Sequence, residues 1–520
     1  MKHRPAPILS LLALLAAAST PVLFAGSLTS AVETIQTRAL RHHCEVLASD
    51  TLEGRETGTR GGEAAGAYIV GVLRKEKKVL PAAQDGDYYQ PFPPNSRNIL
   101  VRLPGSDAAL GREYVVVGAH YDHVGYGSAR NSRGPIGYIH NGADDNASGT
   151  AALLELVDAF CSLDPPPKRS VLFIFWDGEE NGLLGSQYWI SSPTVPLDRI
   201  RLVFNIDMVG RLRQNRAEVF GSRTAPGLRR LLSSQNIDSP VALNFTWETR
   251  RDSDHYSFFA RQVPYLMIFT GKHADYHTPY DDVEKLNVDG MERITRLLFR
   301  TAYAAAQQPV LPPFRSAAFR EGAQAQDEAE TPLPSPPSRL GVTWDEDRAK
   351  HNVIQLTEID PGSAAESAGL QAGDRIVEFD GARITTPDDM RESVYAAGDP
   401  ATAIVERAGQ KSPQALTVHL HGSVDPTGIA CRVDDAEPAC VIVARVLPGS
   451  PAYRAGLRVN DRIQKVGRST FRSLPEFLAL MAGRHDSVEI QIERDGEPQV
   501  LRFAPLRRQT GRKVPPFSPH

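Results

Sequence analysis

Five side chains of the types that bind divalent metal ions lie on five separate stretches of this sequence. They are His120, Asp144, Glu180, Asp207 and His277. Neutral imidazole nitrogens and carboxylate oxygens are the usual ligands of Zn²⁺ outside cysteine-based structural sites. A carboxylate that bridges two ions, with one carboxylate and one histidine on each side, forms a two-metal hydrolytic site with ions about 3.5–4 Å apart. The residue types therefore predict a metal-dependent hydrolase.

Apolar, β-forming runs precede most of these candidate ligands. Residues 113–119 run into His120, residues 170–176 precede Glu179 and Glu180, and residues 201–206 precede Asp207. The run at 264–269 precedes a loop with His277, and Asp144 lies in the turn at 142–149, before an Ala/Leu-rich helical stretch. Ligand crevices in open α/β sheets lie beyond the carboxyl ends of the strands. Side chains that are scattered in sequence can therefore converge there.

Strand-like and amphipathic helical stretches alternate from residue 30 to residue 307. This alternation predicts an α/β catalytic domain with a helix-covered, mostly parallel or mixed sheet. The chain has 520 residues, of which 41% are hydrophobic, so we expect further domains beyond this one. A formal net charge of -4 and the lack of a dense Lys/Arg stripe argue against a nucleic-acid partner.

Residues 1–25 are typical of an export signal. Lys2, His3 and Arg4 precede an apolar run at 8–18, and small residues follow near Ala25, where we expect cleavage. An uncleaved anchor is the alternative, but the continuous apolar run is shorter than a bilayer span. No later stretch is long and apolar enough to cross a membrane. We therefore expect a periplasmic or extracellular protein without stable membrane insertion once the signal is removed.

The C-terminal third of the sequence contains an internal repeat. Residues 359–376 match residues 446–463 with a constant offset of 87, which predicts two copies of one small domain at 338–422 and 426–505. The shared pattern P-G-S-x-A-x-x-A-G-L-x-x-x-D-x-I resembles PDZ domains, which bind peptide segments by adding them as a strand. A β-rich spacer without a ligand is the alternative. The Pro-rich residues 308–337 predict a flexible linker before the repeat.

The candidate ligands also fall within a recognisable set of motifs. The segments at 118–125, 141–150, 175–186, 205–210 and 275–279 resemble, in order, the motifs of the M28 family of dizinc aminopeptidases. Residues 47–62 resemble the segment that precedes the site in bacterial members. The resemblance implies two zinc ions per catalytic domain and peptides as substrates.

The same resemblance implies a role for each ligand. Asp144 would bridge the two ions, His120 and Asp207 would complete one site, and Glu180 and His277 would complete the other. A cis peptide is implied between Asp144 and the next residue, Asp145.

Three neighbouring residues receive roles in catalysis. Glu179 is left free of metal and is predicted to act as the general base. Asp122 is predicted to accept the second imidazole N–H of His120 and fix its tautomer. Tyr276 is a candidate hydrogen-bond donor to the tetrahedral oxyanion, with a packed aromatic side chain as the alternative.

The remaining histidines and cysteines receive plainer interpretations. His123, His140 and His273 are interpreted as polar loop residues. Cys431 and Cys440 flank a predicted turn and are the favoured candidates for a disulfide across a hairpin, whereas Cys44 and Cys161 are as readily buried small side chains.

Three other functions stay open at this point. A carboxypeptidase and a glutaminyl cyclase use a similar site on the same fold. A scaffold dominated by the PDZ-like domains, with little catalysis, is the third alternative.

Overall fold

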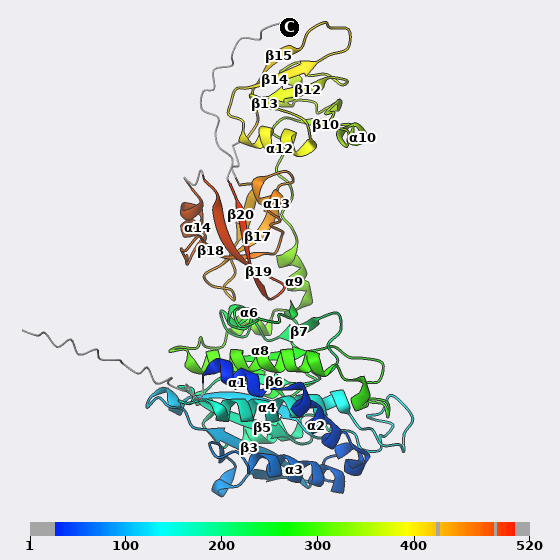
Figure 1. The fold of residues 1–520 in the computed structure, drawn as a ribbon, viewed down its shortest axis with the longest axis vertical. Helices are drawn as coiled ribbons and strands as arrows, with labels where there is room; N and C mark the ends of the chain where they lie inside the picture. The colour runs from blue at the N-terminus through cyan, green and yellow to red at the C-terminus, as the bar shows by residue number, and fades with distance from the viewer. Residues whose placement is uncertain (1–26, 423–426, 483–485, 505–520) are drawn as a thin grey trace, which may run out of the picture.

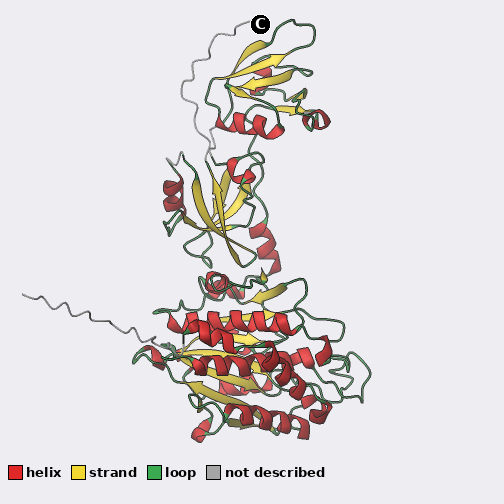
Figure 2. Cartoon of the chain, viewed as in Figure 1, coloured by secondary structure: helices red, strands yellow, loops and turns green. Residues whose placement is uncertain are grey.

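The computed structural model describes residues 27–422, 427–482 and 486–504 (Figure 1). The predicted signal at residues 1–25 lies outside these ranges. An N-terminal α/β domain forms one end of the molecule, and two small β-rich units follow along the long axis (Figure 2). Within the described ranges, no helix is long and apolar enough to span a membrane.

The N-terminal domain is built on one sheet of nine strands. Their order is β1-β3-β5-β4-β6-β9-β7-β8, and β2 pairs with β3 outside this path. The strands are β1 (Leu80–Pro81), β2 (Tyr89–Phe92), β3 (Ser96–Leu103), β4 (Tyr114–His120), β5 (Ser170–Trp176), β6 (Ile200–Ile206), β7 (Arg216–Phe220), β8 (Ala242–Phe245) and β9 (Tyr265–Phe269).

The four central strands, β5-β4-β6-β9, are parallel to one another. The β3–β5 and β7–β9 pairs are antiparallel, so the sheet is mixed, as the sequence predicts. In the register of β4 and β5, His120 lies opposite Trp176 at the carboxyl ends of both strands. The loops that leave these ends therefore start from one edge of the sheet.

Helices cover both faces of this sheet. They are α1 (Leu28–Thr34), α2 (Thr37–Leu47), α3 (Arg60–Leu73), α4 (Gly149–Ser162), α5 (Leu184–Ser191), α6 (Leu228–Ser233), α7 (His255–Phe259) and α8 (Val288–Gln307). Side chains of α1–α4, α6 and α8 pack with Val115 and Val117 of β4 in one core, and α5 and α7 pack with Val116 in the other. Successive side chains of a strand point to opposite faces, so one uniformly apolar strand supplies both cores.

The two β-rich units repeat one arrangement. The first contains β10 (Val342–Trp344), α10 (Glu346–Ala349), β11 (Leu356–Ile359), α11 (Ala364–Ser367), β12 (Arg375–Phe379), β13 (Ala382–Arg383), α12 (Pro387–Ala396), β14 (Ala401–Glu406) and β15 (Gln414–Val418). The second contains β16 (Ile429–Arg432), β17 (Val441–Val446), α13 (Pro451–Arg454), β18 (Arg462–Val466), α14 (Leu474–Met481), β19 (Val488–Arg494) and β20 (Glu497–Phe503). The helices α11 and α13, and likewise α12 and α14, start 87 residues apart, which is the offset of the sequence repeat.

The connection before the repeat differs from the flexible linker that the sequence predicts. Residues Ser316–Phe319 form a 3₁₀ turn and α9 spans Ala323–Glu330. Glu321 forms ion pairs with Arg223, at 2.8 Å, and with Arg315, at 2.6 Å. Further along, Leu333 N–H donates to the carbonyl of Ala444 at 2.8 Å. The proline-rich segment is therefore held to neighbouring parts of the fold, by ion pairs of its charged side chains and by a backbone hydrogen bond.

The second repeat unit, and not the first, adjoins the N-terminal domain (Figure 1). Arg229 of α6 forms a bidentate ion pair with Glu493 of β19 at 2.8 and 3.0 Å, and both side chains are buried. Leu243 N–H, on the edge strand β8, donates to the carbonyl of Asp495 at 2.7 Å. The turn between β19 and β20 thus caps an otherwise open sheet edge.

The predicted disulfide between Cys431 and Cys440 is wrong for this structure, in which both thiols are free. Cys431 lies on β16 opposite Val443, whereas Cys440 precedes β17. The Cys440 thiol lies 3.2 Å from the carbonyl of Glu437. The turn register therefore does not bring the two thiols together. Cys44 and Cys161 are buried, in agreement with the plainer interpretation.

Candidate metal centre

Two clusters of metal-binding donors lie at the carboxyl edge of the central strands. One contains His120, Glu179 and Asp207, and the other contains His123, Asp145, Glu180 and His277. Within each cluster, one donor atom from every residue lies within 4.8 Å of the others. Four of the five ligands that the sequence suggests are therefore present in these clusters, and Asp144 is not.

Asp145, the next residue along, occupies the place expected for Asp144. Its Oδ1 lies 3.4 Å from Nε2 of His120, and its Oδ2 lies 2.9 Å from Nε2 of His277. One carboxylate therefore faces a histidine of each cluster. The cis peptide is likewise displaced by one position and joins Asp145 to Asn146.

The carboxylate of Asp144 points away from both clusters. Its Oδ1 accepts hydrogen bonds from Gly210 N–H at 2.6 Å and from the Ser148 hydroxyl at 3.1 Å, and its Oδ2 lies 3.3 Å from Nε2 of His273. Asp281 holds the turn by accepting the backbone N–H groups of Asp144 and Asp145 at 2.9 and 3.1 Å. Two aspartates in succession point in different directions, and the sequence does not show which one faces the site.

The first cluster lies between β4 and β6. Nε2 of His120 is 3.4 Å from Oδ1 of Asp207. The other ring nitrogen of His120, Nδ1, lies 3.2 Å from the backbone carbonyl of Asp122 and 3.6 Å from its carboxylate. The Asp122 carboxylate instead accepts the backbone N–H groups of Glu179 and Glu180, at 3.1 and 3.3 Å. Asp122 thus contacts His120 through its backbone and supports the glutamate pair through its side chain.

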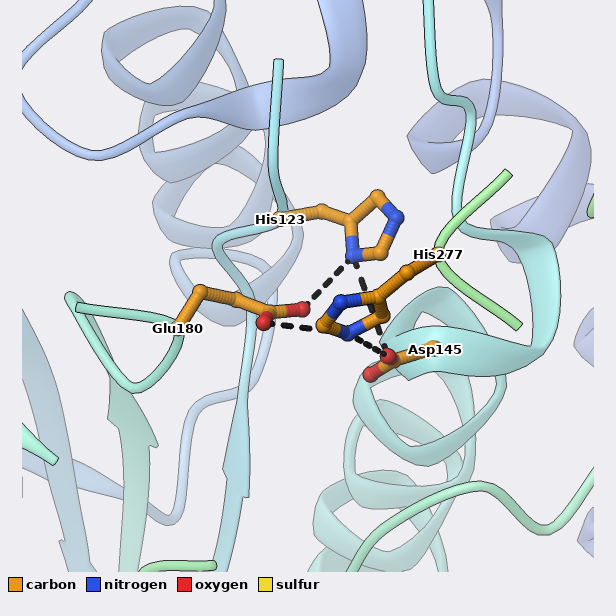
Figure 3. Close-up of side chains that lie close together, drawn as sticks. All are labelled: His123, Asp145, Glu180 and His277. Carbon is orange, nitrogen blue, oxygen red and sulfur yellow. Dashed lines mark hydrogen bonds and ion pairs between the residues drawn. The ribbon is translucent and has the colours of Figure 1, made fainter. Parts of the chain in front are cut away.

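The second cluster has one more donor than the sequence suggests (Figure 3). Glu180 Oε2 lies 3.1 Å from Nε2 of His277, and Glu180 Oε1 lies 2.8 Å from Nδ1 of His123. His277 donates from Nδ1 to the carbonyl of Asn131 at 2.7 Å, which leaves Nε2 to face the carboxylates. The tautomer of His277 is therefore suited to metal binding.

Glu179 belongs to the first cluster but forms no ion pair with a basic side chain in the described residues. Its side chain is 9% exposed. Burial raises the pKa of this carboxyl well above its usual range. A buried carboxylate in a metal-binding cluster, without a basic partner among the described residues, is suited to proton transfer.

A pocket opens beside the first cluster. Its lining includes His120, Asp145, Glu179 and Asp207, and also Phe220, Met267, Phe269, Tyr276, Arg250, Asp252 and Lys272. The ring of Tyr276 stacks on that of His277, with centroids 3.9 Å apart. Tyr276 therefore borders the pocket next to the second cluster, and both interpretations, a hydrogen-bond donor to the oxyanion and a packed aromatic side chain, remain predictions.

The donor chemistry fits zinc. Within the described parts of the chain, histidine is the only basic residue type that pairs with Asp145, Glu180 and Asp207. Nε2 of His277 is buried and lies 2.9 Å from Asp145 and 3.1 Å from Glu180, but neither contact has the geometry of a hydrogen bond, and the described residues offer it no other. Buried carboxylates without Lys or Arg partners need another positive charge, and imidazole with carboxylate is the ligand mixture that Zn²⁺ prefers.

Two residues near the clusters have places that the sequence analysis did not predict. His123 is buried in the second cluster, although it was interpreted as a loop residue. Arg55 is fully buried and donates to the backbone carbonyls of Tyr121, Asn141 and Gly142 at 3.0, 2.6 and 3.0 Å. It ties together the loops that carry His123 and Asp145. The only sequence signal for His123 and Arg55 was that each lies in a segment that resembles M28 sequences.

Comparison with protein families agrees with this geometry. The sequence model of peptidase family M28 matches residues 98–302, and that of the PDZ domain matches residues 355–407 and 442–494. The chain carries an M28 domain and two PDZ domains. The M28 match contains every residue of both donor clusters, whereas Arg55 precedes it.

Individual relatives are more distant. Aminopeptidase YwaD of Bacillus subtilis is 24% identical over 267 residues, covering 49% of this chain and 55% of YwaD. Among solved structures, the LapA aminopeptidase of Legionella pneumophila has a TM-score of 0.44 at 17% identity, covering 54% of this chain and 75% of LapA. A glutaminyl cyclase of Bacteroides thetaiotaomicron has a TM-score of 0.41 at 20% identity, covering 52% of this chain and 98% of the cyclase. The chain thus spans about half the length of the curated relative, and these structures do not distinguish the activities.

Proposed function

We propose that this protein is a zinc-dependent aminopeptidase that removes N-terminal residues from peptides. The observation that carries the proposal is the position of Asp145 between two donor clusters, with Glu179 unpaired beside a pocket. A shared carboxylate between two sets of donors is the arrangement of two-metal hydrolytic sites.

The proposed ligands divide between two ions. His120 and Asp207 would hold one ion, Glu180 and His277 would hold the other, and Asp145 would contribute to both. When bound, the ions supply Lewis-acid polarisation of the scissile carbonyl and lower the pKa of a water.

The chain's own residues then move the protons. Glu179 accepts a proton from the attacking water and returns it to the leaving amine. The Asp122 carboxylate accepts a hydrogen bond from the backbone N–H of Glu179 and so holds the backbone of Glu179 in place. Tyr276 donates its hydroxyl proton in a hydrogen bond to the developing oxyanion, because its ring lines the pocket next to His277.

We further propose that the apolar part of the pocket receives the side chain of the substrate's first residue. Phe220, Met267 and Phe269 form this part. Burial of an apolar side chain there contributes binding energy in proportion to its area. Export of the protein is also part of the proposal, and it rests on the signal-like pattern of residues 1–25.

Mass spectrometry of a mixed peptide library tests the aminopeptidase directly. The zinc-loaded chain should shorten peptides stepwise from the N-terminus, and Glu179→Gln, with its zinc content verified, should not. Loss of C-terminal residues would indicate a carboxypeptidase, and loss of ammonia from N-terminal Gln would indicate a cyclase. Binding of zinc without any turnover would favour a scaffold.

For the first PDZ domain we propose peptide binding between β10 and α12. Leu340, Val342 and Val394 line a hollow there. An added peptide strand would pair with β10, which has a partner, β11, on one side in the described structure.

Fluorescence polarisation with a library of labelled peptides tests this groove. Val394→Lys should abolish binding, while Gln410→Lys, the same charge change at an exposed position, should leave it intact. Equal binding by both variants would place the peptide elsewhere.

A further inference from the structure

His123 is a buried member of the second donor cluster. Its side chain is 0% exposed, and its Nδ1 lies 2.8 Å from Oε1 of Glu180 and 4.0 Å from Oδ2 of Asp145. Figure 3 shows Nδ1 directed at the two carboxylates, next to Nε2 of His277. The ring therefore presents a nitrogen to the same small space as the donors assigned above.

The separations among these donors lie on either side of the ligand spacing in a tetrahedral zinc site. Zinc bonds of 2.0–2.2 Å place tetrahedral ligands roughly 3.3–3.6 Å apart. Three separations in this cluster, 2.8, 2.9 and 3.1 Å, are shorter than that spacing and the fourth, 4.0 Å, is longer, and all four residues offer a donor atom within 4.8 Å of the others. Four protein donors thus surround a volume of the size that one ion requires.

The ring of His123 is held in this orientation by its neighbours. A Cβ on Gly142 would lie 2.4 Å from Cδ2 of His123, so the ring packs into space that only glycine leaves free. On another side it meets the ring of His277 edge-on, with centroids 5.5 Å apart. Its backbone N–H donates to the carbonyl of the buried Arg55 at 3.2 Å. These contacts would hinder rotation of the His123 ring out of the cluster.

We infer that His123 is a zinc ligand through Nδ1, so that the ion held by Glu180, His277 and Asp145 has four protein ligands. This inference rests on the proposed two-zinc site. A zinc ion with four protein ligands has the closed coordination of structural sites, whereas three protein ligands leave a position open. The ion held by His120, Asp207 and Asp145 keeps that open position, next to Glu179 and the pocket. The two ions therefore differ in both affinity and task.

X-ray absorption at the zinc edge counts the imidazole ligands directly. With one equivalent of zinc added to the metal-free full chain, we expect two imidazoles per zinc, from His123 and His277. The variant His123→Asn should show one, because asparagine can still donate a hydrogen bond to Glu180 but has no imidazole. His140→Asn is the matched control, since His140 is a buried loop histidine outside both clusters, and it should show two.

Zinc affinity gives a second readout that does not depend on turnover. Competition with a chelator should show one zinc held at least tenfold more tightly than the other, and His123→Asn should weaken the tighter step at least tenfold while leaving the weaker one unchanged. One imidazole per zinc in the wild type, with unchanged affinity in His123→Asn, would overturn the inference and leave the aminopeptidase intact. Two imidazoles per zinc without peptide cleavage would support the inference and overturn the aminopeptidase. Circular dichroism of each variant checks that it is folded.

Discussion

The donor clusters on the two sides of Asp145 differ in what surrounds them. The cluster of His120, Glu179 and Asp207 lines the pocket, and Glu179 has no ion pair with a basic side chain among the described residues. The cluster of Glu180 and His277 is backed by the buried His123 and by the Asn131 carbonyl. In the proposed two-zinc site, Asp145 thus joins a cluster that borders the pocket to a cluster enclosed by protein. This difference suggests that one ion chiefly takes part in the chemistry and the other chiefly holds the loops in place.

Removal of the shared carboxylate should have the largest effect. Asp145→Asn should lower kcat/KM by at least about 1,000-fold, because loss of both ions forfeits several kcal/mol of transition-state stabilisation. Elemental analysis should show that neither zinc is fully retained. Asp144→Asn, in which the altered side chain faces Gly210 and Ser148, should keep both ions. The opposite ranking would mean that Asp144 is the bridging residue.

Neutralising Glu179 should separate chemistry from metal binding. Glu179→Gln should lower kcat by roughly 100- to 10,000-fold, the range for loss of a general base. Because Glu179 is not assigned to either ion, zinc content should remain at two per chain. Loss of a zinc together with the activity would identify Glu179 as a metal ligand. The two clusters would then no longer differ as an open and a closed metal site.

Stepwise removal of metal tests whether the two sites are unequal. As a chelator is titrated, activity should be lost with release of the first zinc, because the open site has fewer protein ligands. The second zinc should leave at higher chelator concentration and should be the one that affects thermal unfolding more. Release of both ions at the same chelator concentration would contradict the proposed difference in zinc affinity between the two sites.

Loss of the Tyr276 hydroxyl should have the smallest effect of this series. Tyr276→Phe should lower kcat by roughly 10- to 100-fold, less than loss of a full oxyanion-hole donor, because the ions also polarise the carbonyl. KM should change little, since the ring that stacks on His277 is retained. A rise in KM with unchanged kcat would assign Tyr276 to substrate binding alone.

Much of the N-terminal domain could be predicted from the sequence because its signals are local. Apolar runs that stop before a polar residue mark β4, β5 and β6 and place His120, the glutamate pair and Asp207 at one edge of a sheet. The 87-residue repeat likewise predicts two small domains, because similar local patterns favour similar elements, such as α11 and α13. These inferences need no knowledge of which segments meet in space.

The features that were missed depend on side-chain direction or on distant contacts. Asp144 and Asp145 are chemically identical, and only the backbone path through the turn decides which faces the metals. His123 resembles any loop histidine until its burial against Glu180 is known. The proline-rich segment predicts flexibility by composition, yet Glu321 is bound by Arg223, nearly 100 residues away.

Anomalous diffraction at the zinc edge, from crystals of the zinc-loaded full chain, would locate the proposed ions. We expect two ions, one on each side of Asp145, with Glu179 and Asp144 bound to neither. A single ion, or two ions bridged by Asp144, would contradict this expectation.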